Sequence, residues 1–448
     1  MKDRAHIRLP HPLILLLAAV VVASALTWIL PAGEYARRDD PVMHRSVVVA
    51  GTYHVVPRAP VWPFAAAVAI PRGFVEAAEV IAVVLLVGGA WVVVDRLGTL
   101  GRVVAVMVES FRRRGFIAIP IVSLFFATMG ALENMQEEII PLIPVLLILG
   151  RGLGIDAVGV VAMSAGAAMI GSAFAPTNPF QAGIAMKLAQ LPAGSGGALR
   201  LGMLVVALVL WVAWTMCYAA KTRTAASSEP EGHRVEPVSR KDIVVLVLVL
   251  SPMAAYVYGS IALGWGFNEL SAGFFVGGML AGLVGGLSLE KTTLAYLEGM
   301  QSLLPAAMLI GAARSISLVL ADGHVIDTIL EALATPLGHA PAAAAALLMV
   351  PAHAVVHVFV PSVSGQAVLT MPVFVPLSDL LGISRQATVL AYQMGAGLTE
   401  FLTPTNGALM AVLLAAGVPF QRWFRFAVVG VGIALLVGVA GIIVGMRL

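Results

Sequence analysis

Residues 168–178 read AMIGSAFAPTN, and residues 396–406 read AGLTEFLTPTN. Both stretches end in Pro-Thr-Asn, and they lie 228 positions apart. At the same separation, residues 153–155 (LGI) fall on residues 381–383 (LGI). Apolar identities arise easily by chance in a hydrophobic chain, but two shared triplets in one register, one of them polar, do not. The pattern predicts that the chain is an internal duplication.

The composition of the 448-residue chain is that of a polytopic membrane protein. Hydrophobic residues make up 60% and charged residues 11%, whereas a soluble domain carries about 25% charged residues. A soluble enzyme and a disordered scaffold are therefore excluded. A nucleic-acid-binding protein is excluded as well, because the net charge is only +3. The single cysteine, Cys217, allows no intrachain disulfide.

Apolar segments of membrane-spanning length predict an all-α fold in the cytoplasmic (inner) membrane. The clusters of Arg and Lys fall at 95–114, 221–241 and 422–425, which by the positive-inside rule predicts a cytoplasmic N-terminus. The expected spans outside the interrupted stretches are 13–30, 79–94, 198–220, 243–263, 269–287, 303–321 and 426–446.

The duplication divides the chain into two repeats. The first covers residues 1–220 and the second covers residues 242–448, with a polar cytoplasmic linker at 221–241. On the expected topology the helix that starts each Pro-Thr-Asn run crosses in the opposite direction from its partner, so the repeats are inverted. Inverted repeats are typical of secondary transporters, which place the substrate site near the middle of the membrane.

Each repeat contains two interrupted apolar stretches. The stretches 116–150 and 341–381 have polar residues in the middle, between arms of about 12 to 17 residues in the first, and predict re-entrant hairpins. Two thin spans joined by a surface loop are the alternative. The runs 156–191 and 384–418 are too long for one straight span, and their central prolines predict broken helices. The hydroxyls and amides of Pro-Thr-Asn would then face a cavity.

Ionisable residues within membrane segments are costly and are candidates for function. The acidic candidates are Glu133, Glu137, Glu138 and Glu400, and Arg314 is the lone arginine in its apolar span. One interpretation has Arg314 bind a substrate carboxylate. Another has the glutamates bind a cationic substrate or carry a coupled proton. A third has a Glu–Arg314 ion pair that only locks helices together.

Four motifs resemble one family of carriers. They are residues 27–35 (TWILPAGEY), 51–54 (GTYH), 137–141 (EEIIP) and 177–180 (TNPF). Over essentially the whole chain the sequence resembles the YfcC-type carriers, which are grouped with anaerobic four-carbon dicarboxylate carriers and basic amino-acid antiporters of the ion transporter superfamily. The wider superfamily is similar to divalent-anion sodium symporters. This implies two inverted repeats, each with a re-entrant hairpin and a broken helix, in a homodimer.

The resemblance also implies two cation sites, which would hold sodium at the hairpin turns and helix breaks. One is expected from Asn134, Thr177 and Asn178, and the other from Ser362, Ser364, Thr405 and Asn406. The glutamates at the first turn depart from the neutral motif of the symporters. They leave both the coupling ion, sodium or protons, and the sign of the substrate charge open.

These observations predict a secondary active transporter, by symport or antiport, for a small charged organic solute. The solute is a dicarboxylate or an amino acid, and a basic amino-acid exchanger is the alternative to a dicarboxylate carrier. Elevator-like or rocking movement of the hairpins and broken helices would carry it. No ATP-binding motif is present, which disfavours a primary pump. An ion channel is the alternative from another class of protein. The sequence places no set of catalytic residues at one depth of the membrane, so we expect that the protein is not an enzyme and needs no cofactor.

Overall fold

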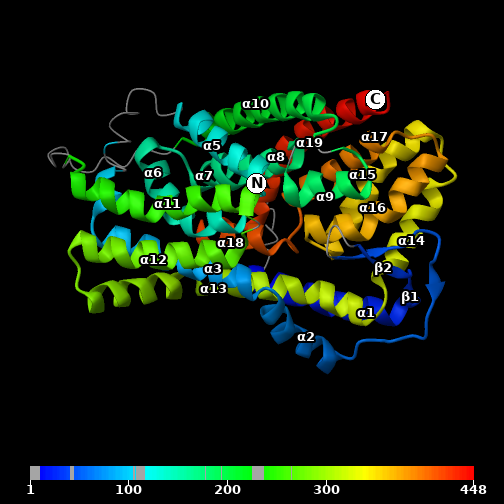
Figure 1. The fold of residues 1–448 in the computed structure, drawn as a ribbon, viewed down its shortest axis with the longest axis horizontal. Helices are drawn as coiled ribbons and strands as arrows, with labels where there is room; N and C mark the ends of the chain where they lie inside the picture. Colours follow the sequence, from blue (N-terminus) through cyan, green and yellow to red (C-terminus); the bar gives the residue numbers. More distant parts are fainter. Residues whose placement is uncertain are drawn as a thin grey trace, which may run out of the picture.

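The computed structural model describes residues 11–40, 45–103, 106, 117–176, 178–192, 194–223, 237–263 and 265–447. They form an elongated bundle of helices with short strands at one end (Figure 1). The helices before residue 224 are α1 (Pro12–Ile29), α2 (Pro63–Glu76), α3 (Ala78–Arg96), α5 (Ala118–Glu133), η2 (Glu137–Leu142), α6 (Ile143–Leu153), α7 (Ala157–Val161), η3 (Ala162–Gly166), α8 (Ala167–Phe174), η4 (Pro179–Gly183), α9 (Ile184–Leu188) and α10 (Gly197–Lys221). The later helices are α11 (Arg240–Leu263), α12 (Phe267–Gly285), α13 (Leu289–Asp322), α14 (Ile326–Leu337), α15 (Ala342–Phe359), α16 (Val363–Leu380), α17 (Arg385–Tyr392), η5 (Gln393–Gly397), α18 (Gly407–Ala415) and α19 (Phe420–Gly445).

Within the described residues, eight helices are long and apolar enough to cross a membrane. They are α3, the continuous run from α7 to α8, α10, α12, α13, α15, α16 and α19. This confirms the expected helical, multi-pass protein. Helix α13 has 34 residues and extends well before the predicted span at 303–321, because its first turns are polar. Helix α2 was not predicted, since Pro71, Arg72 and Glu76 interrupt its apolar sequence.

Both long apolar runs are broken near their Pro-Thr-Asn triplets, as predicted. The first run is helical at 157–174 and again at 179–188, and the second at 385–397 and 407–415. Each first arm contains a π-helical turn, η3 or η5. Two tryptophan side chains add hydrogen bonds to backbone carbonyls in η3 and just after η5. The Trp211 indole donates to the Ala162 carbonyl, and the Trp423 indole donates to the Phe401 carbonyl, both at 2.9 Å.

Each apolar stretch with a polar middle folds as two helical arms joined by a short turn. Helix α5 ends at Glu133, its C-cap Asn134 adopts the left-handed conformation with φ 59°, and η2 begins at Glu137. Helices α15 and α16 are joined through residues 360–362. In the first stretch α5 has 16 residues, within the expected arm length of about 12 to 17. In the second stretch α15 and α16 have 18 residues each, about 27 Å of helix. Arm length therefore permits a full crossing, and the re-entrant path stays a prediction.

The turn of each pair of arms is held against the break in the helix that follows it. The Asn178 amide donates to the Gly130 carbonyl at 3.0 Å, and the Thr405 hydroxyl donates to the Val358 carbonyl at 2.8 Å. The acceptors Gly130 and Val358 are themselves 228 positions apart. A Cβ atom at Gly130 would lie 2.0 Å from the Ala168 carbonyl oxygen. Glycine therefore permits the close contact between α5 and α8.

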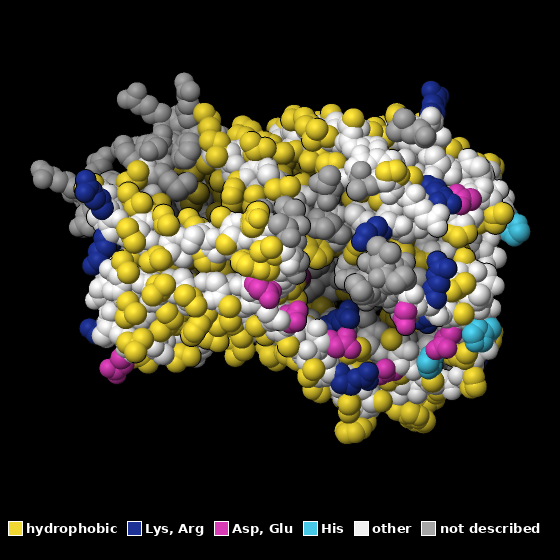
Figure 2. All heavy atoms as spheres, in the orientation of Figure 1, with side chains coloured by type: hydrophobic (Ala, Val, Ile, Leu, Met, Phe, Trp, Pro, Cys, Tyr) yellow, Lys and Arg dark blue, Asp and Glu magenta, His cyan; other side chains and the backbone are white. Residues whose placement is uncertain are grey.

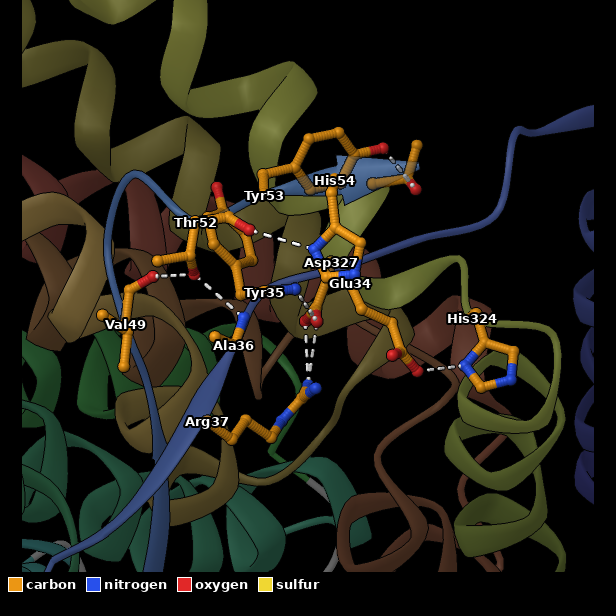
Figure 3. A network of polar contacts seen from close by, with 11 residues as sticks. Glu34, Tyr35, Ala36, Arg37, Val49, Thr52, Tyr53, His54, His324 and Asp327 are labelled. Carbon is orange, nitrogen blue, oxygen red and sulfur yellow. Dashed lines mark hydrogen bonds and ion pairs between the residues drawn. The ribbon is translucent and has the colours of Figure 1, made fainter. Parts of the chain in front are cut away.

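Residues 33–40 and 45–55, called the outer segment below, pack against α14 at one end of the bundle (Figure 3). They contain the antiparallel pairs β1 (Gly33–Glu34) with β4 (His54–Val55) and β2 (Arg37–Asp40) with β3 (Arg45–Val48). The Glu34 carboxylate pairs with the His324 ring at 2.5 Å. The Tyr53 hydroxyl shares a hydrogen bond of 3.0 Å with the Thr328 hydroxyl. Polar contacts therefore join this segment to a helix almost 300 residues away in the sequence.

Asp327 is the centre of this contact, and its side chain is buried. It accepts hydrogen bonds from the Tyr35 backbone N–H at 3.0 Å and from the Arg37 guanidinium at 2.9 and 3.0 Å. The Tyr35 hydroxyl donates to the Glu331 carboxylate. Burial, together with that carboxylate, raises the pKa of the Tyr35 hydroxyl above its ordinary value. Tyr35 therefore stays protonated and keeps donating across the physiological pH range.

We expect Asp327→Asn to lower the free energy of unfolding in detergent by about 1–3 kcal/mol, because an uncharged amide replaces the buried carboxylate that accepts from the Tyr35 N–H and the Arg37 guanidinium. Thermal unfolding of the purified protein measures the change. Asp39→Asn is the control, because Asp39 lies exposed on the same segment and its loss should change stability by less than about 0.5 kcal/mol. Equal effects of the two substitutions would contradict the anchoring role of Asp327.

Candidate functional site

A cavity of about 360 Å³ lies where both turns, the second helix break and α13 meet. On the face shown in Figure 2, acidic and basic side chains gather beside a hollow near the middle of the molecule. The cavity volume is within the range of small-molecule sites. Its polar lining consists of Glu76, Asn134, Gln136, Glu137, Glu138, Tyr256, Arg314, Ser317, Ser362, Ser364, Glu400 and Asn406.

Carboxylates from both halves of the chain meet in this cavity. Glu137 and Glu138 begin η2, directly after the first turn, and Glu400 lies in the second helix break. The Gln136 side-chain amide donates to the Glu400 carboxylate at 2.6 Å, and the Gln136 backbone N–H donates to the Glu138 carboxylate at 3.0 Å. The side chains of Gln136, Glu138 and Glu400 are buried. Gln136 thus joins the first turn to the second break.

Arg314 lines the same cavity from α13 and is already ion-paired. Its Nε donates to the Glu76 carboxylate at 2.9 Å. Glu76 is the last residue of α2, so the pair connects two helices that are far apart in the sequence. Both side chains are about two-fifths exposed, at 43% and 40%. The Glu–Arg314 pair foreseen from the sequence is therefore present, but its acidic partner is Glu76 rather than one of the glutamates considered there.

Two helices begin at the cavity wall. Helix α16 starts after Ser362, whose hydroxyl accepts from the Gly365 N–H at 3.3 Å. Helix α18 starts after Asn406, whose side-chain oxygen accepts from the Leu409 N–H at 3.1 Å. Both side chains therefore serve as N-caps. The first residues of both helices line the cavity, which adds a partial positive charge to this part of the wall.

The first helix break is held together by its own polar groups. Asn178 is fully buried, and its side-chain oxygen accepts from the backbone N–H groups of Phe180 and Gln181 at 2.9 and 3.0 Å. Its amide lies 3.3 Å from both the Asn134 side-chain oxygen and the Ser172 hydroxyl. The Asn178 oxygen expected to bind sodium is therefore engaged as a helix cap.

The second expected sodium site has a similar character. The Thr405 hydroxyl lies 2.7 Å from the Thr403 hydroxyl and donates to the Val358 carbonyl. Ser362 and Asn406 are N-caps. Among the described residues, no group of three or more His, Cys, Asp or Glu side chains could hold a metal ion. The side chains of Asn178, Ser362, Thr405 and Asn406 already have protein partners, and sodium binding stays a prediction.

The structure brings most of the predicted site residues together. Asn134, Glu137, Glu138, Arg314, Ser362, Ser364, Glu400 and Asn406 line one cavity. Asn178 and Thr405 lie behind this wall and support it. Thr177 lies outside the described residues, as does the side chain of Glu133.

Sequence reasoning missed Glu76, Gln136 and Tyr256, which also line the cavity. Glu76 could have been found as a carboxylate within an otherwise apolar stretch. Gln136 lies in the polar middle that was singled out, between residues that were chosen. Tyr256 carries no such signal in the sequence, because an aromatic residue in a membrane helix is ordinary.

Acidic groups outnumber basic groups in this cavity. Of the lining residues that the structure describes, four are glutamates and Arg314 is the one basic side chain. Arg314 is partly neutralised by Glu76. Glu137, Glu138 and Glu400 therefore leave the cavity with an acidic excess, that is, more carboxyl than basic groups. When ionised, these carboxyl groups attract cations and cationic ends of solutes.

The family model of the C4-dicarboxylate anaerobic carrier matches residues 9–447 of the chain. The chain belongs to this carrier family. The match confirms the resemblance seen in the sequence motifs. The family match and the candidate membrane spans together show that the protein is a multi-pass membrane transporter.

Known relatives extend over almost the whole chain. It is 27% identical to the Escherichia coli K12 protein named "Putative basic amino acid antiporter YfcC", over 98% of this chain and 96% of that protein. It is 26% identical to a Haemophilus influenzae protein, over 98% and 97% of the two chains. Among solved structures, the YdaH transporter of Alcanivorax borkumensis has a TM-score of 0.47 and 18% identity, over 97% of this carrier and 98% of YdaH.

We expect Asn178→Ala to destabilise the carrier by about 1–3 kcal/mol, because the change removes a helix cap and leaves the Gly130 carbonyl without its side-chain donor. Thermal unfolding in detergent measures this. Asn268→Ala is the matched control, since Asn268 makes one exposed hydrogen bond to Glu79. If the two substitutions have the same effect, Asn178 does not hold the break together.

Proposed function

We propose that this carrier is a secondary antiporter for small organic solutes with a positive charge, of the basic amino-acid class. The single observation that carries the proposal is the acidic excess of the cavity. Glu137, Glu138 and Glu400 converge there from both halves of the chain, while Arg314 has Glu76 as its partner. A cationic end of a solute provides the missing counter-charge.

Electrostatic energy distinguishes the two candidate substrates. Two unit charges 4 Å apart interact by about 4 kcal/mol at an effective dielectric constant of about 20. A dicarboxylate brings two negative charges into a cavity that already has an acidic excess, so both would be repelled unless several glutamates were protonated. A basic amino acid brings a net positive charge and is attracted. The name of the Escherichia coli relative, "Putative basic amino acid antiporter YfcC", supports the same choice.

A C4-dicarboxylate carrier is the second candidate. The description of the matching family supports it, as do Arg314 and the two helix N-termini at the cavity wall. Each of these groups attracts carboxylates. The two candidates differ in their dependence on the glutamates, since transport of a cation requires these side chains and transport of a dicarboxylate does not.

We further propose the architecture of two inverted repeats, residues 1–220 and 242–448, with a cytoplasmic linker at 221–241. The hydrogen bonds from the breaks to the Gly130 and Val358 carbonyls, whose acceptors lie 228 positions apart, support the duplication. The position of both turns at one cavity supports hairpins that reach membrane depth. The N-terminus lies in the cytoplasm of this inner-membrane protein, which works as a homodimer. Elevator-like or rocking movement moves the solute, driven by exchange or by sodium or protons.

Counterflow into proteoliposomes tests the function. Vesicles loaded with unlabelled ornithine are expected to accumulate labelled ornithine, arginine or lysine from outside, because an antiporter exchanges solutes across the membrane. Labelled succinate should not accumulate, with or without sodium. Exchange of succinate but not of ornithine would establish the dicarboxylate candidate instead. Uptake that neither saturates nor responds to internal solute would indicate a channel.

Replacing the glutamates tests the source of the affinity. Glu137→Gln and Glu400→Gln are each expected to weaken ornithine exchange about 10- to 100-fold, because each removes a charged partner of the cation. Glu290→Gln is the control, since Glu290 is exposed at the start of α13, away from the cavity lining. Unchanged apparent affinity in both cavity variants would contradict the proposed cation site.

A further inference from the structure

The cavity combines two opposite kinds of charge. Glu137, Glu138 and Glu400 make part of the wall acidic, whereas Arg314 and the starts of α16 and α18 make another part basic. We propose that Arg314 binds the carboxylate of the substrate and thereby distinguishes an amino acid from the amine that lacks this group. The inference rests on the proposed function and names the residue that determines its specificity.

The guanidinium of Arg314 has donors to spare. The hydrogen bond to Glu76 uses Nε, and the described residues show no hydrogen bond from either terminal nitrogen of this side chain. A guanidinium presents five N–H donors in a planar fork that binds carboxylates through two parallel bonds. Arg314 therefore keeps its ion pair with Glu76 while its terminal nitrogens bind the carboxylate of the substrate.

The pair with Glu76 also fixes the position of Arg314. Helices α2 and α13 pack closely, because a Cβ atom at Gly73 would lie 2.5 Å from the Gly311 carbonyl oxygen. A second ion pair on the same two helices joins Arg72 to Asp322. Arg314 is thus held in place before a substrate arrives, which reduces the entropy lost on binding.

The start of α18 lies next to the turn of α13 that carries Arg314. A Cβ atom at Gly407 would lie 3.0 Å from the Cβ of Ala313, the residue before Arg314. The N-terminal end of a helix carries a partial positive charge. A substrate carboxylate bound by Arg314 therefore meets a second favourable field. Arg314 supplies the charge and the directed hydrogen bonds, and the helix start adds to them.

Only a substrate with both charges satisfies the whole cavity. A diamine has no carboxylate for Arg314, and a dicarboxylate has no cation for Glu137 and Glu400. An amino acid with a cationic side chain supplies both. Loss of a hydrogen-bonded charge partner changes affinity about 10- to 100-fold. This carrier is therefore expected to prefer ornithine over putrescine, which is ornithine without its carboxylate, by about that factor.

Competition with labelled ornithine on the purified full-length carrier tests the proposal. Unlabelled ornithine or putrescine competes with labelled ornithine for binding to the wild-type carrier, to Arg314→Gln and to Arg72→Gln. Arg314→Gln is expected to weaken the binding of ornithine about 10- to 100-fold and to leave the binding of putrescine unchanged, so that the preference for ornithine disappears. Arg72→Gln is expected to keep the preference, because Arg72 forms the equivalent ion pair on the same helices without lining the cavity.

A second measurement needs no variant. Ornithine methyl ester keeps the carbon chain and the amino groups of ornithine and adds one methyl group, but it lacks the anionic carboxylate. We expect wild-type carrier to bind it about as weakly as putrescine. Equal binding of ornithine, its ester and putrescine would overturn the role of Arg314 and leave the proposed function intact. An equal loss of binding for ornithine and putrescine in Arg314→Gln would have the same consequence. Failure of the wild-type carrier to bind any of the three would overturn the proposed function itself.

Discussion

The structure depends on satisfying backbone groups where helices break within a membrane. No water is available in the bilayer core, so each freed N–H and carbonyl needs a partner in the protein. Asn178 caps the helix after the first break and donates to the Gly130 carbonyl. Thr405 and Asn406 divide the same two tasks at the second break. The repeated Pro-Thr-Asn triplet thus contains both the cause of the break and the means of stabilising it.

These hydrogen bonds also determine where the cavity lies. The Asn178 and Thr405 hydrogen bonds run from the breaks to the last turns of α5 and α15, so each turn between two helical arms is held beside a break. Gln136 then bonds the first turn to Glu400 in the second break. The groups that line the cavity therefore belong to segments that are positioned by backbone contacts rather than by the substrate, which is the preorganisation that binding sites require.

Much of this arrangement could be predicted from the sequence, because it follows from local rules. The prolines predicted the helix breaks, and the ionisable residues within apolar segments predicted the glutamates of the cavity wall. What could not be predicted are contacts between distant elements. Glu76 reaches Arg314 across 238 positions, and no local pattern relates them. The sequence also did not show whether a polar side chain binds a cation or caps a helix. The Asn178 side-chain oxygen, which could bind a cation, accepts hydrogen bonds from two backbone N–H groups.

In the proposed duplication, the two halves share the order of turn and helix break but differ in the charged residues that they carry. Glu137 and Glu138 of the first turn correspond, 228 positions later, to Gly365 and Gln366, while Glu400 corresponds to Ser172. The acidic groups therefore come from the turn of one half and the break of the other, and they meet only because the halves interlock. A symmetric cavity would present the same charge on both sides. The asymmetry lets one wall attract a cation while Arg314, also without an equivalent in the first half, attracts an anion.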